Sequence, residues 1–334
     1  MPSSPPRRLI AVMLLIPLVA ALALWAFAWP AARIAPRDLP LGIAGPPAAA
    51  DPLASGLERD HRGAFELHRY PDEAAARRAV ESRAVYGAVV AGPEGVRLLT
   101  ASAASPVVAQ LLTQAVTARA PGRTPVPVVD VVPTPSADPR GGVLGASLLP
   151  LALAGIVTGA AVTVLGLRGT WAALGLTGAA AAAGVAVAAL AHSWLGVLTG
   201  DWWAEAGSIG LTVLAIGAAV AGLATLIGRA GIALGSVVMV LLGNSFSGVT
   251  SAPELLPAPI GAIGQRLPPG AGGSLLRSVA YFDGSAAGTP LLTLSLWAAL
   301  GLAAVLAGGR IGKPAPAGDD PVAENRTATA VPVG

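Results

Sequence analysis

Long apolar runs dominate this sequence and limit what it can fold into. A membrane-spanning helix needs about 20 consecutive apolar residues, and runs near or above that length occur at residues 9–29, 143–167, 171–193, 207–227, 231–248 and 290–309. Of the 334 residues, 54% are hydrophobic and 12% are charged, whereas a typical soluble domain has roughly 25% charged residues. One water-soluble core cannot cover that much apolar surface. We therefore expect a polytopic α-helical membrane protein with six transmembrane helices.

The first run, residues 9–29, follows a polar segment, residues 1–8, that ends in Arg7 and Arg8. The alternative to a membrane anchor is a cleaved signal peptide, because residues 26–28 read Ala-Phe-Ala, like a cleavage site. The apolar core of a signal peptide usually has about 7–15 residues, and this run is longer. We favour a retained anchor, with residues 1–8 in the cytoplasm.

Basic residues lie just beyond the ends of alternate spans. Alternation of the spans places all of them on one side, as the positive-inside rule requires: Arg7, Arg8, Arg168, Arg229, Arg310 and Lys313. Tryptophans gather near the predicted interfaces, Trp171 at the inner one and Trp29, Trp194, Trp202 and Trp203 at the outer one. The bias toward Ala, Gly, Pro and Arg is typical of GC-rich bacterial genomes. We expect a multi-pass protein of the bacterial inner (plasma) membrane with both termini cytoplasmic.

Residues 30–142 carry charges at ordinary density and predict a small extracytoplasmic α/β domain between the first two spans. Apolar and β-branched patterns indicate strands at residues 39–44, 65–70, 85–91, 96–101 and 126–132. Helical spacing indicates helices at residues 73–83, capped by Asp72, and 105–119. We expect residues 32–138 to fold alone.

Residues 249–289 are too rich in proline and glycine for a simple span. They still carry apolar residues, which predict a segment that re-enters the outer leaflet and returns: Leu255, Leu256, Ile260, Ile263, Leu275 and Leu276. The final segment, residues 310–334, has a polar, proline-rich composition that predicts a disordered cytoplasmic tail.

The residues give no support for an enzyme. The chain has no cysteine, its three histidines have no ligand spacing, and Lys313 is followed by proline rather than by the Ser or Thr of a phosphate-binding loop. We expect no catalytic residue, no cofactor, no metal and no nucleic-acid partner. Between the span ends we find no Asp, Glu, Lys or Arg, which counts against a proton-driven transporter. His192 is interpreted as a satisfied interfacial side chain.

Two groups of residues are candidates for function or packing. Polar residues at the end of the fifth span and in the outer segment either line a substrate path or cap and connect helices: Asn244, Ser245, Ser247, Glu254, Gln265 and Arg266. Small residues four apart allow close helix contact, within the chain or in a dimer: Gly155 and Gly159, and Gly231 and Gly235.

Three stretches resemble the type-2 ABC exporter permease superfamily, in particular its bacterial YhgE/Pip-like branch. The first combines residues 73–80 with residues 85–90, and the second combines residues 130–133 with residues 138–141. The third, which is the most specific, contains Gly243-Asn244-Ser245-Phe246-Ser247-Gly248, Glu254-Leu255-Leu256-Pro257, Leu267-Pro268-Pro269-Gly270-Ala271 and Tyr281-Phe282-Asp283-Gly284.

The resemblance implies short helices that re-enter before the last span, a homodimer and a separate ATPase subunit. The sequence departs from the family in having only Arg168-Gly169-Thr170 between the second and third spans. The expected function is a permease-like subunit that exports a lipophilic compound, lipid or envelope component. The alternative is a non-transporting envelope scaffold or secretion accessory whose outer domain binds a partner.

Overall fold

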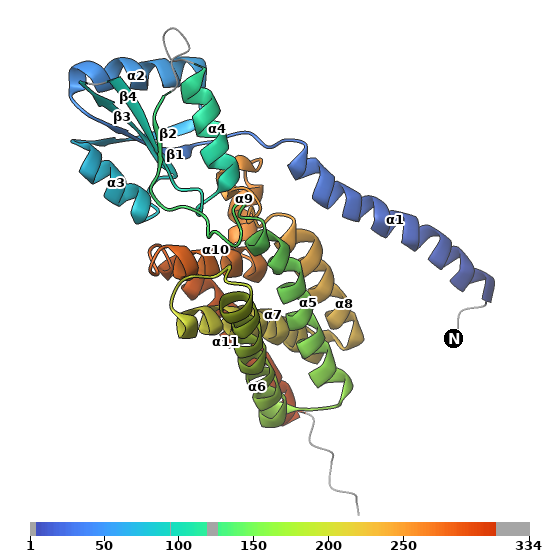
Figure 1. The fold of residues 1–334 in the computed structure, drawn as a ribbon. Coiled ribbons are helices and arrows are strands. Elements are labelled where there is room, and N and C mark those ends of the chain that lie inside the picture. The colour runs from blue at the N-terminus through green and yellow to red at the C-terminus, as the bar shows by residue number, and fades with distance from the viewer. Residues whose placement is uncertain (1–4, 94, 119–125, 312–334) are drawn as a thin grey trace, which may run out of the picture.

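The computed structural model describes residues 5–93, 95–118 and 126–311. A sheet domain lies at one end of a helical bundle, and helix α1 (Pro5–Ala31) runs apart from the bundle (Figure 1). Because α1 begins at Pro5, part of the predicted polar segment is helical. The predicted tail falls almost entirely on residues 312–334, outside the described part of the chain, although residues 310 and 311 belong to the last helix.

The sheet domain contains five strands in the order β2-β1-β3-β4-β5. Only the β3–β4 pair is antiparallel, and the other neighbours are parallel. The strands are β1 (Leu39–Ala44), β2 (Phe65–Tyr70), β3 (Gly87–Gly92), β4 (Gly95–Thr100) and β5 (Val128–Asp130), and the helices are α2 (Pro47–Asp60), α3 (Glu73–Glu81) and α4 (Pro106–Thr117). This small mixed sheet confirms the expected strands and helices, and its extracytoplasmic location stays a prediction.

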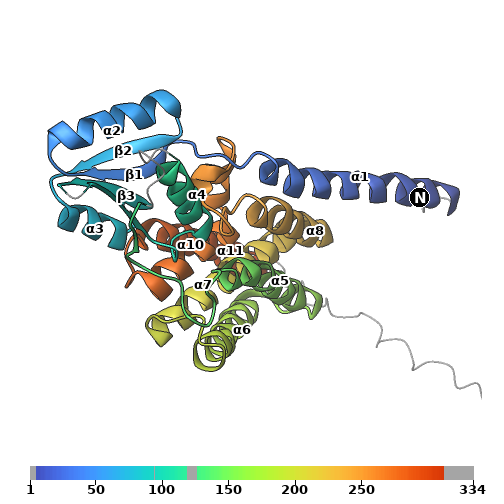
Figure 2. The same ribbon diagram turned by 45° about the horizontal axis from the view of Figure 1, so that its top comes forward.

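Alternation along the strands assigns side chains to the two faces of the sheet. Leu41 and Ile43 pack with α2 and α4 on one face, whereas Ala88 and Val90 pack with α3 on the other. Figure 2 shows α2 and α3 on opposite faces of the sheet. Both faces are covered, which explains why β1 and β3 are apolar at nearly every position.

The sequence patterns predicted no helix between the strands at residues 39–44 and 65–70, but α2 lies there. Gly45, with a φ of 121°, turns the chain after β1, and Pro47 then opens the helix. Proline fits the first helical position because the N–H that it lacks would have no partner there. Ala50, Ala54 and Leu57 form the buried face of this helix.

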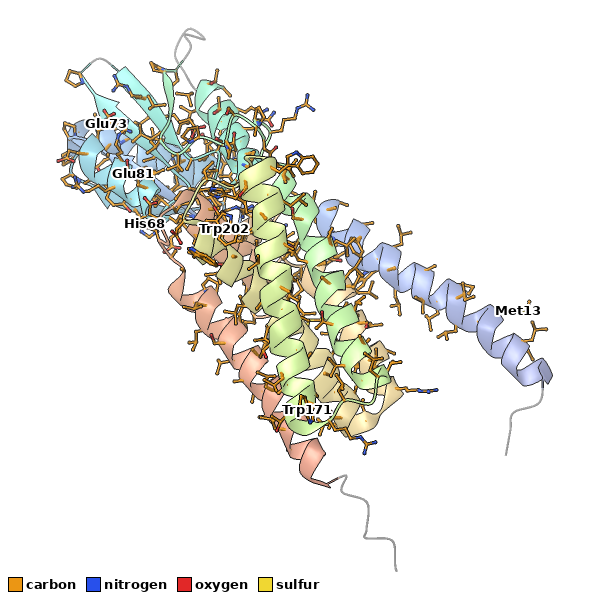
Figure 3. All side chains as sticks on the ribbon, turned by 60° about the horizontal axis from the view of Figure 1, so that its bottom comes forward. Met13, His68, Glu73, Glu81, Trp171 and Trp202 are labelled. Atoms are coloured by element: carbon orange, nitrogen blue, oxygen red, sulfur yellow. The ribbon has the colours of Figure 1, made fainter. Side chains whose placement is uncertain are left out.

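Five helices are long and apolar enough to cross a membrane. The candidate spans are Met13–Ala31 in α1, Val143–Val164, which is α5, Gly169–Trp194, which combines α6 (Gly169–Ala188) with η2 (Ala189–Trp194), Trp202–Ile227, which is α7, and Gly288–Gly309 in α11 (Gly288–Ile311). Helix α7 is central, because 72% of its most apolar stretch is buried against 11–33% in the others. Figure 3 shows Trp171 and Trp202 at opposite ends of the bundle, as an aromatic belt requires.

The predicted fifth span is shorter than the others. It consists of α8 (Arg229–Val237) and η3 (Val238–Asn244), which together give the apolar helix Arg229–Asn244. Nine and seven residues rise about 24 Å at 1.5 Å each, less than the roughly 30 Å of a hydrocarbon core. Five long helices are therefore present in the described chain, and a sixth crossing stays a prediction.

The paired glycines lie at helix contacts within the chain. A Cβ added to Gly155 would lie 2.6 Å from Ile216 Cβ of α7, and one added to Gly159 would lie 2.4 Å from the Gly217 carbonyl oxygen of the same helix. Gly231 meets the backbone of Leu223, also in α7, and Gly235 is likewise close to α7, at Val220. Their observed role is to let α5 and α8 approach the central helix.

Residues 249–289 form η4 (Pro253–Leu255), α9 (Ile260–Gln265) and α10 (Pro268–Tyr281). Protein covers the apolar side chains of this segment except Ile263, which is 41% exposed: Leu255, Leu256, Ile260, Leu275 and Leu276 are buried. Re-entry of the segment into the outer leaflet stays a prediction. Leu255 completes the α2–α4 core of the sheet domain, and Phe282 completes the α3 core. A fragment of residues 32–138 lacks both, so we expect it to be less stable than the domain in the whole chain.

Replacing Leu255 with alanine tests this shared core. Leu255 is fully buried, and a Leu→Ala change at such a position typically costs about 2–5 kcal/mol. We expect a lower melting temperature and faster proteolysis of the sheet domain in the purified full chain. Ile263→Ala, at an exposed position of the same segment, is the control. Equal melting of the two variants would contradict the shared core.

Candidate functional site

A cavity of about 520 Å³ lies where the sheet domain, η4, α9, α10 and the first turn of α11 meet. Its polar lining comes from sequence regions that are far apart: Arg37, Arg83, Tyr86, Glu254, Gln265 and Arg277. Figure 1 shows α9 and α10 between the sheet and the bundle, so the cavity lies at the junction of the two halves.

The connection between α1 and β1 is fixed to η4 through backbone groups. The Ala35 N–H donates to the Leu255 carbonyl at 3.1 Å, and the Arg37 N–H donates to the Glu254 carbonyl at 3.0 Å. Arg37 Nη1 adds a bond of 2.8 Å to the Leu255 carbonyl. These contacts hold Arg37 at the edge of the cavity and orient Glu254 toward it.

Tyr86 and Glu254 form the acidic side of the cavity. The Tyr86 hydroxyl donates to Glu254 Oε2 at 2.8 Å. Burial, reinforced by the negative charge of Glu254, raises the pKa of Tyr86. The phenol therefore stays protonated and acts as a hydrogen-bond donor to the carboxylate.

Arg83 reaches the bundle from the turn between α3 and β3, where its φ of 59° lies in the left-handed region. Its Nη1 donates to Ser278 Oγ at 2.5 Å and to the Ser274 carbonyl at 3.2 Å, both on α10. The guanidinium also lies 5.4 Å from the centre of the Phe282 ring. Burial lowers the pKa of Arg83.

The floor of the cavity is a hydrogen-bonded set on α9 and α10. Gln265 Nε2 donates to the Ser247 carbonyl at 2.6 Å, and Gln265 Oε1 accepts from Ser274 Oγ at 2.7 Å. Arg277, which is 5% exposed, donates from Nη2 to the Val249 carbonyl at 2.6 Å. The polar side chains of the segment therefore support its irregular backbone.

The structure brings together part of the predicted substrate path. Glu254 and Gln265 line the cavity, and Ser247 lies beneath Gln265. The other three do not line it. The Asn244 carbonyl accepts from Ser247 Oγ at 2.7 Å, a helix-end contact. Ser245 Oγ is buried without a hydrogen-bond partner among the described residues, and Arg266 is exposed at the turn between α9 and α10.

Sequence reasoning missed Arg37, Arg83, Tyr86 and Arg277. Arg277 carried a signal, because it is a lone charge in the apolar run of residues 275–279, and a charge in a membrane-inserted segment suggests function. The other three carried no such signal, because their hydrogen-bond partners on η4 and α10 are far along the chain. The separations are 218 residues for Arg37, 195 for Arg83 and 168 for Tyr86.

A second polar pair corrects the predicted start of the fourth span and supplies the partner of His192. Helix α7 begins at Trp202, capped by Asp201, so Glu205 lies in its first turn rather than outside the span. Glu205 is fully buried, and its Oε2 lies 2.8 Å from His192 Nδ1. Its Oε1 accepts from the Gly200 N–H at 2.8 Å. His192 is therefore satisfied, but by a buried carboxylate, and a charged group does lie within one of the long helices.

Replacing Glu205 with leucine would leave the Gly200 N–H and His192 without their acceptor. Leaving a buried hydrogen-bond donor without its acceptor typically costs about 1–3 kcal/mol, so we expect a drop in the melting temperature of the purified chain. Glu81→Ala, at an exposed residue of α3, is the matched control. An unchanged Glu205→Leu melt would show that the pair contributes no stability.

In the part of the chain that the structure describes, no group of three His, Asp or Glu side chains is arranged to hold a metal ion. The cavity instead offers arginine donors, two carboxylates and apolar walls, a set suited to binding an amphiphilic molecule. Comparisons of the chain with protein-family models, with curated proteins and with solved structures found no match.

Proposed function

We propose that this chain is a permease-like membrane subunit of an ABC-type exporter that moves a lipophilic compound, lipid or envelope component outward. It acts as a dimer with a separate ATPase subunit, in the bacterial inner membrane. The observation that carries the proposal is the depth of the turn between α9 and α10. Trp297 Nε1 donates to the Arg266 carbonyl at 2.9 Å, which ties this turn to the side of α11.

The position of Trp297 along α11 is used to estimate how deep the turn between α9 and α10 lies. Trp297 follows Gly288, the first residue of α11, by nine positions, which corresponds to about 13 Å at 1.5 Å per residue. On the other side, Gly272 of α10 packs on Thr212, which follows Trp202 by ten positions of α7. If α7 and α11 cross a hydrocarbon core of roughly 30 Å, the turn lies near its middle.

Irregular backbone at that depth has to be buried in protein or line a water-filled cavity. Gln265 and Ser274 put polar side chains there. Both line the cavity of about 520 Å³ described above, which we call the outer cavity. Ala258, Pro259, Ala262 and Pro290 provide apolar walls beside them. A polar entry with apolar walls, open from outside to mid-depth, fits the passage of a molecule that has both a polar and an apolar part.

A second cavity, of about 560 Å³, lies at the other end of α7 between the α5–α6 connection and α11, and Arg168, Thr225 and Gly308 line it. Between the two cavities, Gly155 and Gly301 let α5 and α11 pack closely on α7. Small residues at helix contacts let the backbones approach closely. We propose that a change in the packing of α5 and α11 on α7 exposes the two cavities in alternation.

One observation favours the alternative, a scaffold or secretion accessory whose outer domain binds a partner. The connections at the inner end are short: residues 165–168 join α5 to α6, and Gly228 alone joins α7 to α8. These short connections offer little surface for an ATPase subunit to bind.

The test combines co-purification with transport. The tagged full chain is purified from its native membrane in mild detergent, its partners are identified, and the complex is reconstituted in liposomes with a fluorescent short-chain lipid. We expect an ATP-hydrolysing subunit to co-purify and ATP to accelerate lipid transfer. If no ATP-hydrolysing subunit co-purifies, ATP does not accelerate transfer, and a partner of the outer domain is found instead, the exporter proposal is wrong and the scaffold is favoured.

A pair of variants makes the transport test specific. Ala262 is exposed and lines the outer cavity, and Ala179 is exposed on α6 away from it. We expect Ala262→Trp to slow transfer several-fold by filling the entry, and Ala179→Trp to leave it unchanged. Equal rates in the two variants would contradict passage through the cavity.

A further inference from the structure

Arg277 is a buried cation without an anion. It is 5% exposed, and its one hydrogen bond within the described residues goes from Nη2 to the neutral Val249 carbonyl. A guanidinium has five N–H donors, so the described residues leave most of these donors unused. No carboxylate lies within 4.0 Å of it among the described residues. Buried charges are normally paired, because an unpaired one costs several kcal/mol.

Arg83 brings a second guanidinium to the same turn of α10. Its partners are the Ser278 hydroxyl, next to Arg277, and the Ser274 carbonyl. It also forms no ion pair within the described chain. Two like charges from different halves of the molecule therefore converge on one wall of the cavity, held by neutral acceptors.

The carboxylates of the cavity do not balance these charges. The charged lining consists of Arg37, Arg83 and Arg277 against Asp38 and Glu254, three minus two, which leaves one positive charge. Glu254 is bonded to Tyr86 rather than to Arg83 or Arg277. The cavity therefore has the charge and the free donors to accept an anion.

Apolar residues lie beside the cavity. Thr289 of α11 lines it, and Leu292, three positions further on and therefore on the same face of the helix, is 61% exposed. Leu256 and Pro259 add apolar walls to the cavity. An occupant could place an anionic group against the arginines and an apolar chain along α11.

We propose that this cavity binds the phosphate group of a membrane amphiphile, with Arg83 and Arg277 holding the phosphate oxygens. Guanidinium groups match phosphate oxygens in both charge and geometry, and bind them through paired N–H donors. The inference rests on the cavity of the proposed function and names its ligand class.

Binding is measured on the full chain in non-ionic detergent by calorimetry. Three probes separate the sources of the chemistry: phosphatidic acid with two hexanoyl chains, the neutral diacylglycerol with the same chains, and inorganic phosphate. We expect phosphatidic acid to bind at least ten-fold more tightly than either of the others. Equal affinity for inorganic phosphate would support the anion site and assign it a soluble ligand. Equal affinity for the neutral lipid would overturn the proposal.

Variants identify the side chains. Arg277→Gln and Arg83→Gln should each weaken phosphatidic acid binding about ten-fold or more, whereas Arg59→Gln, at an exposed arginine of α2, should not. If Arg277→Gln fails to fold, Arg83→Gln, at a partly buried position, decides the question alone. Wild-type affinity in a folded Arg83→Gln variant would overturn the assignment.

The binding and transport results are separable. Lipid transfer by the reconstituted complex without phosphatidic acid binding would remove the ligand class and leave the exporter. Binding that depends on Arg83, without any transfer, would leave the phosphate site in a protein that does not transport.

Discussion

The irregular backbone of residues 247–289 cannot satisfy all of its hydrogen bonds within its own helices, and most of the polar architecture follows from that constraint. Prolines and glycines divide the segment into three short helices, so carbonyl groups such as those of Ser247, Val249 and Leu255 are left without helical partners. Gln265, Arg277 and Arg37 donate to these three carbonyls in turn. Unsatisfied backbone groups are costly wherever water is scarce. The side chains that line the cavity are therefore also the ones that hold its walls.

The long helices depend on a different physical device, close contact through small residues. Helix α7 is buried along most of its length because α5, α8 and α11 each present glycines to it, among them Gly159, Gly231 and Gly301. Such contacts replace the hydrophobic effect, which does not drive association between helices already in lipid. A substitution with any larger side chain at these positions would meet α7 backbone at less than normal contact distance.

Local signals in the sequence predicted the local parts of the structure. Hydropathy located all five long helices, and alternation located the strands, because both patterns are read within one element. The predicted start of α7 was wrong because a carboxylate inside a span is unusual, and the His192 and Gly200 contacts that compensate Glu205 cannot be read from the local sequence. Burial of Leu255 in the sheet domain could not be predicted, because Leu255 lies far along the chain from the strands it covers and no local pattern links them.

The distribution of charge also limits how such a molecule could perform work. Apart from Glu205 at the start of α7, the charged groups of the described chain lie outside the five long spans or at their ends. Arg83, Arg277 and Glu254 line the cavity between the sheet domain and the bundle, where they can bind and orient a polar group. If this chain moves an amphiphile, as we propose, these side chains select the cargo and a partner subunit supplies the energy.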